Sequence, residues 1–288
     1  MNITSSSVAI ITGASSGIGK SLAIQLSKKG VTVVLVARRT EKLEELAASI
    51  KANNGKALAI TADVSIKNEA EMVVKKTLDT FGTVDILINN AGRGNRASVE
   101  DTTPEMLESI FGVNVYSLWY MTAAVLPTMK ANRRGHIMNV ASVAGKTGYP
   151  FNSAYVAAKH ACVGFTSSLR TELVSTGVEA TVVCPAGVST EWATVTDGGP
   201  ISEIFFGGIT RAKQIAEERG VGLPPLTGML TPDVVAEIMI KGIEAGNISD
   251  IFTHEGSHEQ SVQLAKDRTS YEEKLFPLYL GMQETYYK

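Results

Sequence analysis

A tyrosine and a lysine stand four residues apart in the alanine-rich segment SAYVAAKHA, residues 153–161. In a helix this spacing places Tyr155 and Lys159 one turn apart on the same face. A phenol ordinarily titrates near ~10 and is a poor base at neutral pH, and a lysine cation beside it lowers its pKa. The pair is therefore a candidate for acid–base chemistry. The alternative is that both side chains only cover the surface of a neighbouring element.

A glycine-rich stretch, TGASSGIG, occupies residues 12–19 between an apolar run and an amphipathic run. Its glycines, Gly13, Gly17 and Gly19, follow the spacing G-x-x-x-G-x-G. Glycines at a strand-to-helix turn let the backbone approach a pyrophosphate, which then lies at the helix N-terminus. The stretch predicts a dinucleotide site. A tight turn that binds no ligand is the alternative.

Two arginines, Arg38 and Arg39, follow the second apolar run of the chain. Sites for NAD place a carboxylate at this position to bind the ribose hydroxyls. Guanidinium groups suit a 2′-phosphate instead, so the sequence favours NADP(H) over NAD(H). It does not choose between the two arginines. Solvated charges ahead of a helix are the alternative interpretation.

Short apolar runs alternate with longer amphipathic runs through most of the chain. The apolar runs predict strands at residues 7–13, 31–37, 55–63, 84–92, 135–142, 178–187 and 249–254. The amphipathic runs predict helices at residues 16–30, 41–53, 67–82, 104–131, 153–177 and 232–246. Strands that are apolar throughout and separated by helices indicate a parallel sheet covered on both faces. We therefore predict an α/β fold, a doubly wound (Rossmann-type) parallel sheet of about seven strands flanked by helices, with ligands at the carboxyl ends of the strands.

Residues 190–230 interrupt this order with Gly- and Pro-rich segments around a short helix expected near Arg211–Arg219. We expect this insertion after the sixth strand to be a substrate lid within a single dinucleotide-binding catalytic domain, residues 1–288. The tail to Lys288 is expected to be partly helical, without a definite place.

The composition is that of an ordinary globular protein, with 44% hydrophobic and 19% charged residues and a net charge of −2 over 288 residues. This charge gives no electrostatic reason to expect a nucleic acid as partner. We expect no signal peptide, because no basic region precedes a long apolar run, and no apolar stretch of the roughly 18 residues that a membrane helix needs. Cys162 and Cys184 show no metal spacing. We therefore expect a reducing, cytoplasmic setting, no metal site and no membrane partner.

Six motifs together carry a family resemblance: Thr12–Gly19, Asn89–Gly92, Asn114, Ser142, Tyr155 with Lys159, and Pro185–Thr190. Their order and spacing resemble the short-chain dehydrogenases/reductases, in the subgroup with the T-G-x-x-x-G-x-G turn, from about Val8 to Thr190. Two features depart from the family pattern. Ala186 stands where the family usually has glycine, and IFTHEGSHEQ replaces a glycine-rich ending after the last strand. The second departure weakens an assignment to the acyl-carrier-protein reductases.

The resemblance implies four catalytic residues. Tyr155 would be the acid–base, and Lys159 would lower its pKa and bind the nicotinamide ribose. Ser142 would hydrogen-bond the substrate oxygen. Asn114 would hold a water that relays protons to the lysine. Taken alone, Ser142 could equally be a strand-end cap and Asn114 a polar residue satisfied within its helix.

The resemblance also implies a cofactor site, in which Asp63 contacts the adenine, Asn90 lines the cofactor side of the sheet and Thr190 binds the nicotinamide carboxamide. The expected cofactor-binding residues are Gly13, Ser15, Ser16, Gly17, Ile18, Gly19, Arg38, Arg39, Asp63, Val64, Asn90, Ala91, Gly92, Tyr155, Lys159, Pro185, Val188 and Thr190.

The function expected from these features is that of an NADPH-dependent carbonyl reductase, acting reversibly on ketones or aldehydes with an apolar body. The alternatives are an NAD(P)-linked hydroxysteroid or polyol dehydrogenase that works oxidatively, and, more remotely, a non-catalytic dinucleotide sensor. The helix at 104–131 is apolar around much of its circumference, which indicates a subunit interface. The resemblance implies a homo-oligomer, a tetramer or dimer, formed through this helix and the one that carries Tyr155.

Several other residue types are weaker candidates. The histidines show no convincing metal spacing, so surface or strand-end roles are expected for His136, His160, His254 and His258. Cys184 is expected to be a buried structural thiol. Four residues of the insertion either line an apolar substrate pocket or hold the lid down: Trp192, Phe205, Phe206 and Met229.

Overall fold

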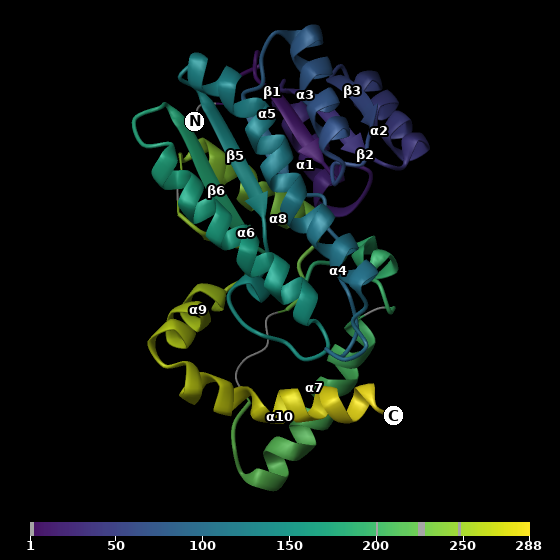
Figure 1. The fold of residues 1–288 in the computed structure, drawn as a ribbon, viewed down its shortest axis with the longest axis vertical. Helices are drawn as coiled ribbons and strands as arrows, with labels where there is room; N and C mark the ends of the chain where they lie inside the picture. Colours follow the sequence, from purple (N-terminus) through teal and green to yellow (C-terminus); the bar gives the residue numbers. More distant parts are fainter. Residues whose placement is uncertain (1–2, 200, 224–227, 247–248) are drawn as a thin grey trace.

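The computed structural model describes residues 3–199, 201–223, 228–246 and 249–288. Its centre is a seven-stranded sheet in the order β3-β2-β1-β4-β5-β6-β7, in which every neighbouring pair is parallel. The predicted α/β fold with a doubly wound parallel sheet is therefore confirmed (Figure 1). The strands are β1 (Val8–Thr12), β2 (Thr32–Ala37), β3 (Lys56–Thr61), β4 (Ile86–Asn89), β5 (Gly135–Val140), β6 (Val178–Cys184) and β7 (Ile251–Phe252).

Helices cover both faces of the sheet (Figure 1). Successive residues of β1 point to opposite faces, so Ala9 and Ile11 pack against one helical layer and Val8 and Ile10 against the other. Because the strands are buried on both faces, their sequences are apolar throughout rather than alternating. The first layer consists of α1 (Gly17–Lys28), α2 (Thr40–Ala52) and α8 (Pro232–Glu244), and the second of α3 (Lys67–Phe81), α5 (Ser117–Ala131) and α6 (Ser153–Glu172).

The strand order creates a switch point between β1 and β4. The chain runs from β1 outward to β2 and β3, and then returns to place β4 on the other side of β1. The connections that leave the carboxyl ends of β1 and β4 therefore diverge to opposite faces of the sheet, which opens a crevice between them. The glycine turn follows β1 directly and so lies at this crevice.

The run Pro104–Ala131 is helical, as expected, but contains a π-helical turn. α4 (Pro104–Phe111) continues through the π segment Gly112–Tyr116 into α5. A π turn breaks the regular hydrogen-bond ladder and frequently occurs at functional sites. Here it contains Asn114.

This run is also long and apolar enough, by length and composition, to cross a membrane, which corrects the expectation that no stretch reaches that length. The correction arises because hydropathy averaged over a helix tolerates polar residues that interrupt an apolar stretch. The most apolar 18-residue window is 44% buried inside the protein, and Met121, Val125 and Met129 pack against the sheet. The core helix of a globular protein passes the same test, and the contacts of this run are those of a core helix.

The chain after β6 places three helices beyond the carboxyl ends of the strands (Figure 1). α7 (Ile201–Arg219) lies against α10 (Arg268–Tyr286), and α9 (Ser257–Lys266) precedes α10. The short helix expected near residues 211–219 was wrong in extent, since α7 has 19 residues. The glycines that suggested a break instead permit close helix packing, because a Cβ at Gly208 would lie 2.5 Å from the Cγ of Met282 in α10. Of the expected lid, residues 200 and 224–227 lie outside the described residues.

Tyr286 stabilises the contact between α10 and the rest of the protein. Its ring stacks on Phe151 with the centroids 3.9 Å apart, and its hydroxyl accepts a hydrogen bond from the backbone N–H of Ser98 at 3.2 Å. We expect Tyr286→Leu to lower the free energy of unfolding by about 2 kcal/mol. Tyr286→Phe keeps the stacked ring and should cost about 1 kcal/mol. Urea titration measures both, and a Leu variant as stable as the wild type would contradict this account of the contact.

Candidate active site

The glycine turn after β1 is braced by the segment after β4. The hydroxyl oxygen of Thr12 accepts hydrogen bonds from the backbone N–H groups of Asn90 and Ala91, both at 3.0 Å. The side-chain amide of Asn90 donates to the carbonyl of Thr12 at 2.9 Å. Asn90 and Ala91 therefore fix the shape of the turn from the opposite side of the crevice.

Three glycines shape the turn itself. Gly13 and Gly17 have φ values of +67° and +54°, in the left-handed region that favours glycine. At Gly19 a Cβ would lie 2.5 Å from the carbonyl oxygen of Gly13, so the first turn of α1 approaches β1 closely. Among the described side chains none caps this helix start, since Ser16 at the N-cap makes no capping hydrogen bond. The first N–H groups of α1 are thus left for an anion, while Ile18 packs against the core.

The structure separates the two arginines that follow β2. Arg39 lies across the glycine turn and donates to the hydroxyl oxygens of Ser15 at 2.9 Å and Ser16 at 2.7 Å. Its guanidinium also lies 3.2 Å from the carboxylate of Glu191. The guanidinium of Arg38 lies 3.6 Å from the carboxylate of Asp63. Of the two, Arg39 is the one in contact with the glycine turn.

Asp63 is held as a carboxylate at the end of the crevice. Burial by itself would raise its pKa, but hydrogen bonds from the backbone and hydroxyl of Ser65, at 3.0 Å and 2.6 Å, and the charge of Arg38 bring the pKa below its usual value. Val64, the next residue, is buried in the core. The side chains expected around the adenine therefore lie together beyond β3.

Ser142, Tyr155 and Lys159 converge near the carboxyl end of β5. Ser142 follows this strand, and Tyr155 and Lys159 lie one turn apart in α6, as expected. The hydroxyl of Ser142 makes a hydrogen bond with the phenol of Tyr155. The ammonium of Lys159 lies 5.5 Å from the centroid of the Tyr155 ring and donates to the carbonyl of Val140 at 2.8 Å. Both Tyr155 and Lys159 are buried.

Burial shifts the pKa values of both Tyr155 and Lys159. Burial raises the pKa of the Tyr155 phenol above its usual value, and the hydrogen bond with Ser142 offsets only part of the shift. Burial also lowers the pKa of Lys159. The net direction for Tyr155 is set by burial, and the expected lowering of its pKa by Lys159 stays a prediction. The cause of both shifts is desolvation, which penalises the charged form of each group.

Asn114 presents an unpaired oxygen to the same cluster. Its amide nitrogen donates to the carbonyls of Ile110 and Arg93, both at 2.9 Å. Its Oδ1 is buried and has no hydrogen-bond partner among the residues that the structure describes. A Cβ at Gly92 would lie 2.7 Å from this oxygen and 3.5 Å from the ammonium of Lys159. The two polar groups therefore face one small space beside Gly92, which a Cβ would fill.

The loop after β6 joins the two halves of the site. The carbonyl of Pro185 accepts hydrogen bonds from the backbone N–H of Val143 at 2.9 Å and from the hydroxyl of Ser142 at 3.2 Å. Further along, Val188 forms a backbone bridge with Leu230. The methyl carbon of Thr190 lies 3.1 Å from the position that a Cβ of Gly17 would take. The loop thus runs from the Ser142 cluster to the glycine turn.

Trp192 lies at this site rather than among the C-terminal helices. Its ring centroid is 5.2 Å from that of Tyr155, and its indole would collide with a Cβ at Gly94. Phe205 instead packs into the hydrophobic cluster of α7 and α10, and Phe206 is half exposed. The sequence left open whether these aromatic residues line a substrate pocket or hold the lid down. In the structure Trp192 lies beside Tyr155, whereas Phe205 packs in the cluster of α7 and α10.

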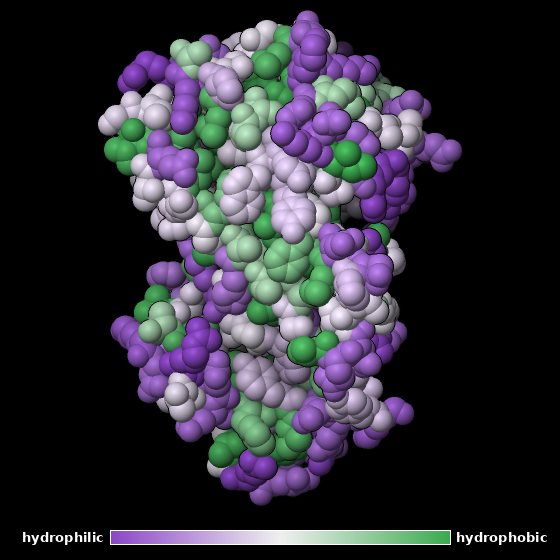
Figure 2. Space-filling view, in the orientation of Figure 1, coloured by the Kyte–Doolittle hydropathy of each residue, from purple (hydrophilic) through white to green (hydrophobic). Residues whose placement is uncertain are grey.

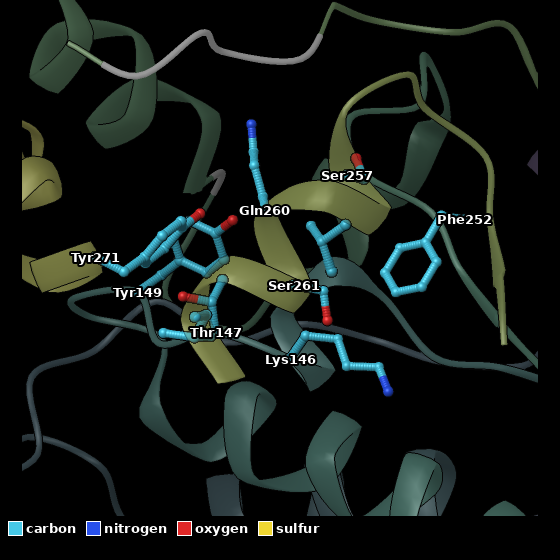
Figure 3. A pocket seen from close by; sticks show the side chains of 10 residues that line it. Lys146, Thr147, Tyr149, Phe252, Ser257, Gln260, Ser261 and Tyr271 are labelled. Carbon is cyan, nitrogen blue, oxygen red and sulfur yellow. The ribbon is translucent and has the colours of Figure 1, made fainter. Parts of the chain in front are cut away.

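A cavity adjoins the loop that follows Ser142 (Figure 3). Thr147 and Tyr149 of this loop line it together with Tyr271 and Ser257 of the C-terminal helices. The phenol groups of Tyr149 and Tyr271 point in the same direction in Figure 3. The tail that the sequence could not place therefore lines space next to the candidate site.

His136 and the two cysteines are buried in the protein. His136 is buried in β5 beside the carboxylate of Glu179, 3.2 Å away. Cys162 and Cys184 are free and buried, and burial raises the pKa of Cys162 to about 11 and that of Cys184 to about 12. Within the described parts of the chain, no three His, Cys, Asp or Glu side chains lie close enough to hold a metal ion.

Two buried polar residues were missed from the sequence as parts of this site. Asn95 accepts a hydrogen bond from the backbone N–H of Tyr155 at 3.0 Å and so stabilises the start of α6. His254 contacts the loop after β6 at Ala186 and Gly187. Its position directly after the last strand, at the edge where ligands bind, was a usable signal. Nothing in the sequence pattern marked Asn95.

Residues 7–198 match the sequence profile of a family described as short chain dehydrogenase. The ketoacyl reductase HetN of Nostoc sp. is 35% identical over 235 residues, which cover 82% of this chain and 74% of that protein. A short chain dehydrogenase/reductase from Burkholderia phymatum, solved in complex with NAD, is 25% identical with a TM-score of 0.80, covering 93% of this chain and 96% of that one. An alcohol dehydrogenase from Thermococcus sibiricus, complexed with 5-hydroxy-NADP, is 25% identical with a TM-score of 0.70, covering 86% and 96%. The similarity therefore spans the glycine turn, the Tyr155 cluster and the whole sheet.

Proposed function

The chain belongs to the short-chain dehydrogenase/reductase family, and from this premise we propose that it is an NADPH-dependent carbonyl reductase for ketones or aldehydes with an apolar body. Membership makes it an oxidoreductase that acts on CH–OH or C=O groups with a nicotinamide dinucleotide. The observation that carries the finer proposal is the buried Tyr155 beside Ser142, with Arg39 across the glycine turn.

The residues present fit a nicotinamide dinucleotide. The uncapped start of α1 offers backbone N–H groups to a pyrophosphate, and Arg39 offers a guanidinium to a 2′-phosphate. We assign the adenine half to the neighbourhood of Asp63 and Arg38, whose charged groups lie 3.6 Å apart, and the carboxamide to Thr190 on the loop that reaches the glycine turn. When bound, the cofactor supplies the hydride. Binding NADP(H) requires the 2′-phosphate to compete with Glu191 for Arg39.

The proton comes from this chain. Tyr155 donates its phenolic proton to the carbonyl oxygen of the substrate while Ser142 donates a hydrogen bond to the same oxygen. The contact between the Ser142 hydroxyl and the phenol supports this arrangement, because it places both groups at one point. Holding the oxygen about 3 Å from the phenol provides the proximity that the step needs.

Lys159 and Asn114 restore the proton. The unpaired Oδ1 of Asn114 is a site for a water molecule within reach of the Lys159 ammonium. Lys159 is also placed to bind the nicotinamide ribose, since its ammonium lies next to Gly92 at the crevice. The π turn supports this role of Asn114, because Asn114 lies where the regular helical hydrogen bonds are interrupted and such turns are frequent at functional sites.

The raised pKa of Tyr155 predicts the pH dependence. A phenol must be neutral to donate a proton and ionised to accept one, so reduction is supported below its pKa and oxidation above it. Because burial raises this pKa, the phenol should stay protonated beyond pH about 10, where a free tyrosine ionises. The difference in phenolate absorbance between the wild type and Tyr155→Phe, recorded against pH, measures it. Ionisation of Tyr155 near pH 7 would contradict this prediction.

The substrate has a keto or aldehyde group and an apolar body next to it. Trp192 lies against Tyr155 and offers an aromatic wall to the group that flanks the carbonyl. The Nostoc relative is named a ketoacyl reductase, which is consistent with a keto substrate. The cavity beside Tyr149 and Tyr271 gives the more distant part of the substrate a partly polar lining.

We further propose that the protein is a cytoplasmic homo-oligomer. Figure 2 shows hydrophobic and weakly polar residues over α5 and α6 in the middle of one face, with strongly hydrophilic residues around them. On α5, Trp119 is 49% exposed, and its ring packs against Phe165 of α6. An exposed apolar face of this kind supports self-association through these two helices. The two free, buried cysteines fit a reducing compartment.

The test is the absorbance decay of NADPH and, separately, of NADH with a panel of aliphatic, aromatic, steroid and dicarbonyl substrates. We expect oxidation of NADPH in preference to NADH with at least one class of ketone or aldehyde. Turnover with NADH alone would overturn the cofactor proposal. Absence of turnover, in protein shown to bind NADPH, would count against the carbonyl reductase and favour the dinucleotide sensor.

A further inference from the structure

We infer that His254 positions the nicotinamide half of the cofactor by holding the loop after β6. It bonds two backbone groups of that loop, the N–H of Ala186 and the carbonyl of Gly187. The inference rests on the proposed function, in which this loop lies beside the nicotinamide. His254 lies on the segment IFTHEGSHEQ, which stands where the family usually has a glycine-rich ending.

The contacts of His254 are short and buried. Its Nδ1 lies 3.2 Å from the backbone nitrogen of Ala186, and its Nε2 lies 2.8 Å from the carbonyl oxygen of Gly187. The hydroxyl of Thr253 lies 2.8 Å from the same Nδ1. The imidazole is only 7% exposed. A buried ring with both nitrogens bonded has one orientation, and it therefore fixes the groups that it binds.

The backbone partners determine the tautomer. A carbonyl oxygen can only accept, so Nε2 carries the hydrogen that bonds to Gly187. A backbone N–H can only donate, so Nδ1 is unprotonated towards Ala186. The neutral imidazole thus satisfies one donor and one acceptor that flank the Ala186–Gly187 peptide group. The imidazole therefore holds the peptide groups on either side of the Ala186–Gly187 link, namely Pro185–Ala186 through its N–H and Gly187–Val188 through its carbonyl.

The rest of the loop is held from two other directions. Pro185 is bonded to the Ser142 segment, which carries the catalytic hydroxyl. Leu230 donates its backbone N–H to Gly187 at 3.0 Å and accepts from Ser189 at 2.9 Å. Between these points, Ala186 stands where the family usually has glycine. His254 supplies the contact to the backbone N–H of Ala186 and so completes the positioning of the loop.

Three substitutions separate the two hydrogen bonds. In His254→Asn the side-chain oxygen can replace Nδ1 as acceptor for Ala186, and the bond to Gly187 is lost. In His254→Gln the longer amide can donate to Gly187, and the bond to Ala186 is lost. His254→Phe keeps a ring of similar shape and loses both bonds. His258→Phe is the matched control, because His258 lies on α9 against Phe252.

The readout compares two ligands of each variant by fluorescence titration: NADPH, and ADP-ribose carrying a 2′-phosphate, which lacks the nicotinamide. We expect His254→Phe to weaken NADPH binding about tenfold, and the Asn and Gln variants to weaken it less. Binding of the ADP-ribose derivative should be unchanged in all of them. The control should match the wild type with both ligands.

Each other outcome overturns the inference. An equal loss of affinity for both ligands would show that His254 only stabilises the protein in general. Unchanged NADPH affinity in His254→Phe would show that His254 does not position the cofactor. If the Phe variant does not fold, the Asn and Gln variants decide, since each keeps one bond. Failure of the wild type to bind either ligand would instead refute the proposed NADP(H) function, so the two failures are distinguishable.

Discussion

Replacing Tyr155 by phenylalanine is expected to lower kcat for carbonyl reduction by about a thousandfold. The substitution removes only the phenolic hydroxyl, which is the proposed proton donor, and keeps the ring that packs against Trp192. The affinity for NADPH should change by less than about threefold, because the cofactor contacts assigned to Lys159 and the glycine turn remain. Steady-state rates and a fluorescence titration with NADPH measure the two quantities.

Ser142→Ala is the companion variant, since it removes the hydroxyl that contacts the phenol and leaves the phenol in place. It should retain more activity than Tyr155→Phe, because the proton donor survives and only the positioning bond is lost. A Tyr155→Phe enzyme that kept more than about a tenth of wild-type kcat would refute the assignment of Tyr155 as the acid.

The second large effect concerns Arg39. We expect Arg39→Ala to lower kcat/KM with NADPH by about a hundredfold and to change kcat/KM with NADH by less than about threefold. The guanidinium that contacts Ser15 and Ser16 is the proposed partner of the 2′-phosphate, which NADH lacks. The ion pair between Arg39 and Glu191 limits the loss expected for Arg39→Ala, because in the wild type the phosphate must displace the Glu191 carboxylate before it binds.

Arg38→Ala is the matched control for charge. Its guanidinium lies by Asp63, on the side expected for the adenine that both cofactors share. Its loss should therefore affect NADPH and NADH alike. If Arg38→Ala abolished the preference for NADPH and Arg39→Ala left it intact, the assignment of the two arginines would be reversed.

The sheet and the glycine turn were predictable because their determinants are local. A strand buried on both faces must be apolar throughout, and a turn with positive φ at Gly13 and Gly17 requires glycine. The convergence of Ser142, Tyr155 and Lys159 follows from strand order, since the carboxyl ends of neighbouring parallel strands lie at one edge.

Features that depend on distant partners were not predictable. The Gly-rich segment that contains Gly208 suggested a break in the helix. In the structure Gly208 instead lets α10 pack closely against α7, at Met282. This contact joins residues far apart in the sequence, so only the packed structure reveals it. The role of Trp192 likewise depends on its contact with Tyr155, and the role of His254 on its bonds to the backbone N–H of Ala186 and the carbonyl of Gly187. The direction of the Tyr155 pKa depends on burial, which the four-residue spacing from Lys159 does not disclose.

The central claim is that this chain moves a hydride from a bound nicotinamide to a carbonyl carbon, with the proton supplied by Tyr155. The most direct measurement uses NADPH that carries deuterium at the transferable position of the nicotinamide ring, a ketone that proves active in the panel, and mass spectrometry of the product. We predict one deuterium on the carbinol carbon of the alcohol formed by the wild type, and about a thousandfold less labelled alcohol from Tyr155→Phe in the same time. An unlabelled alcohol from the wild type would contradict the account.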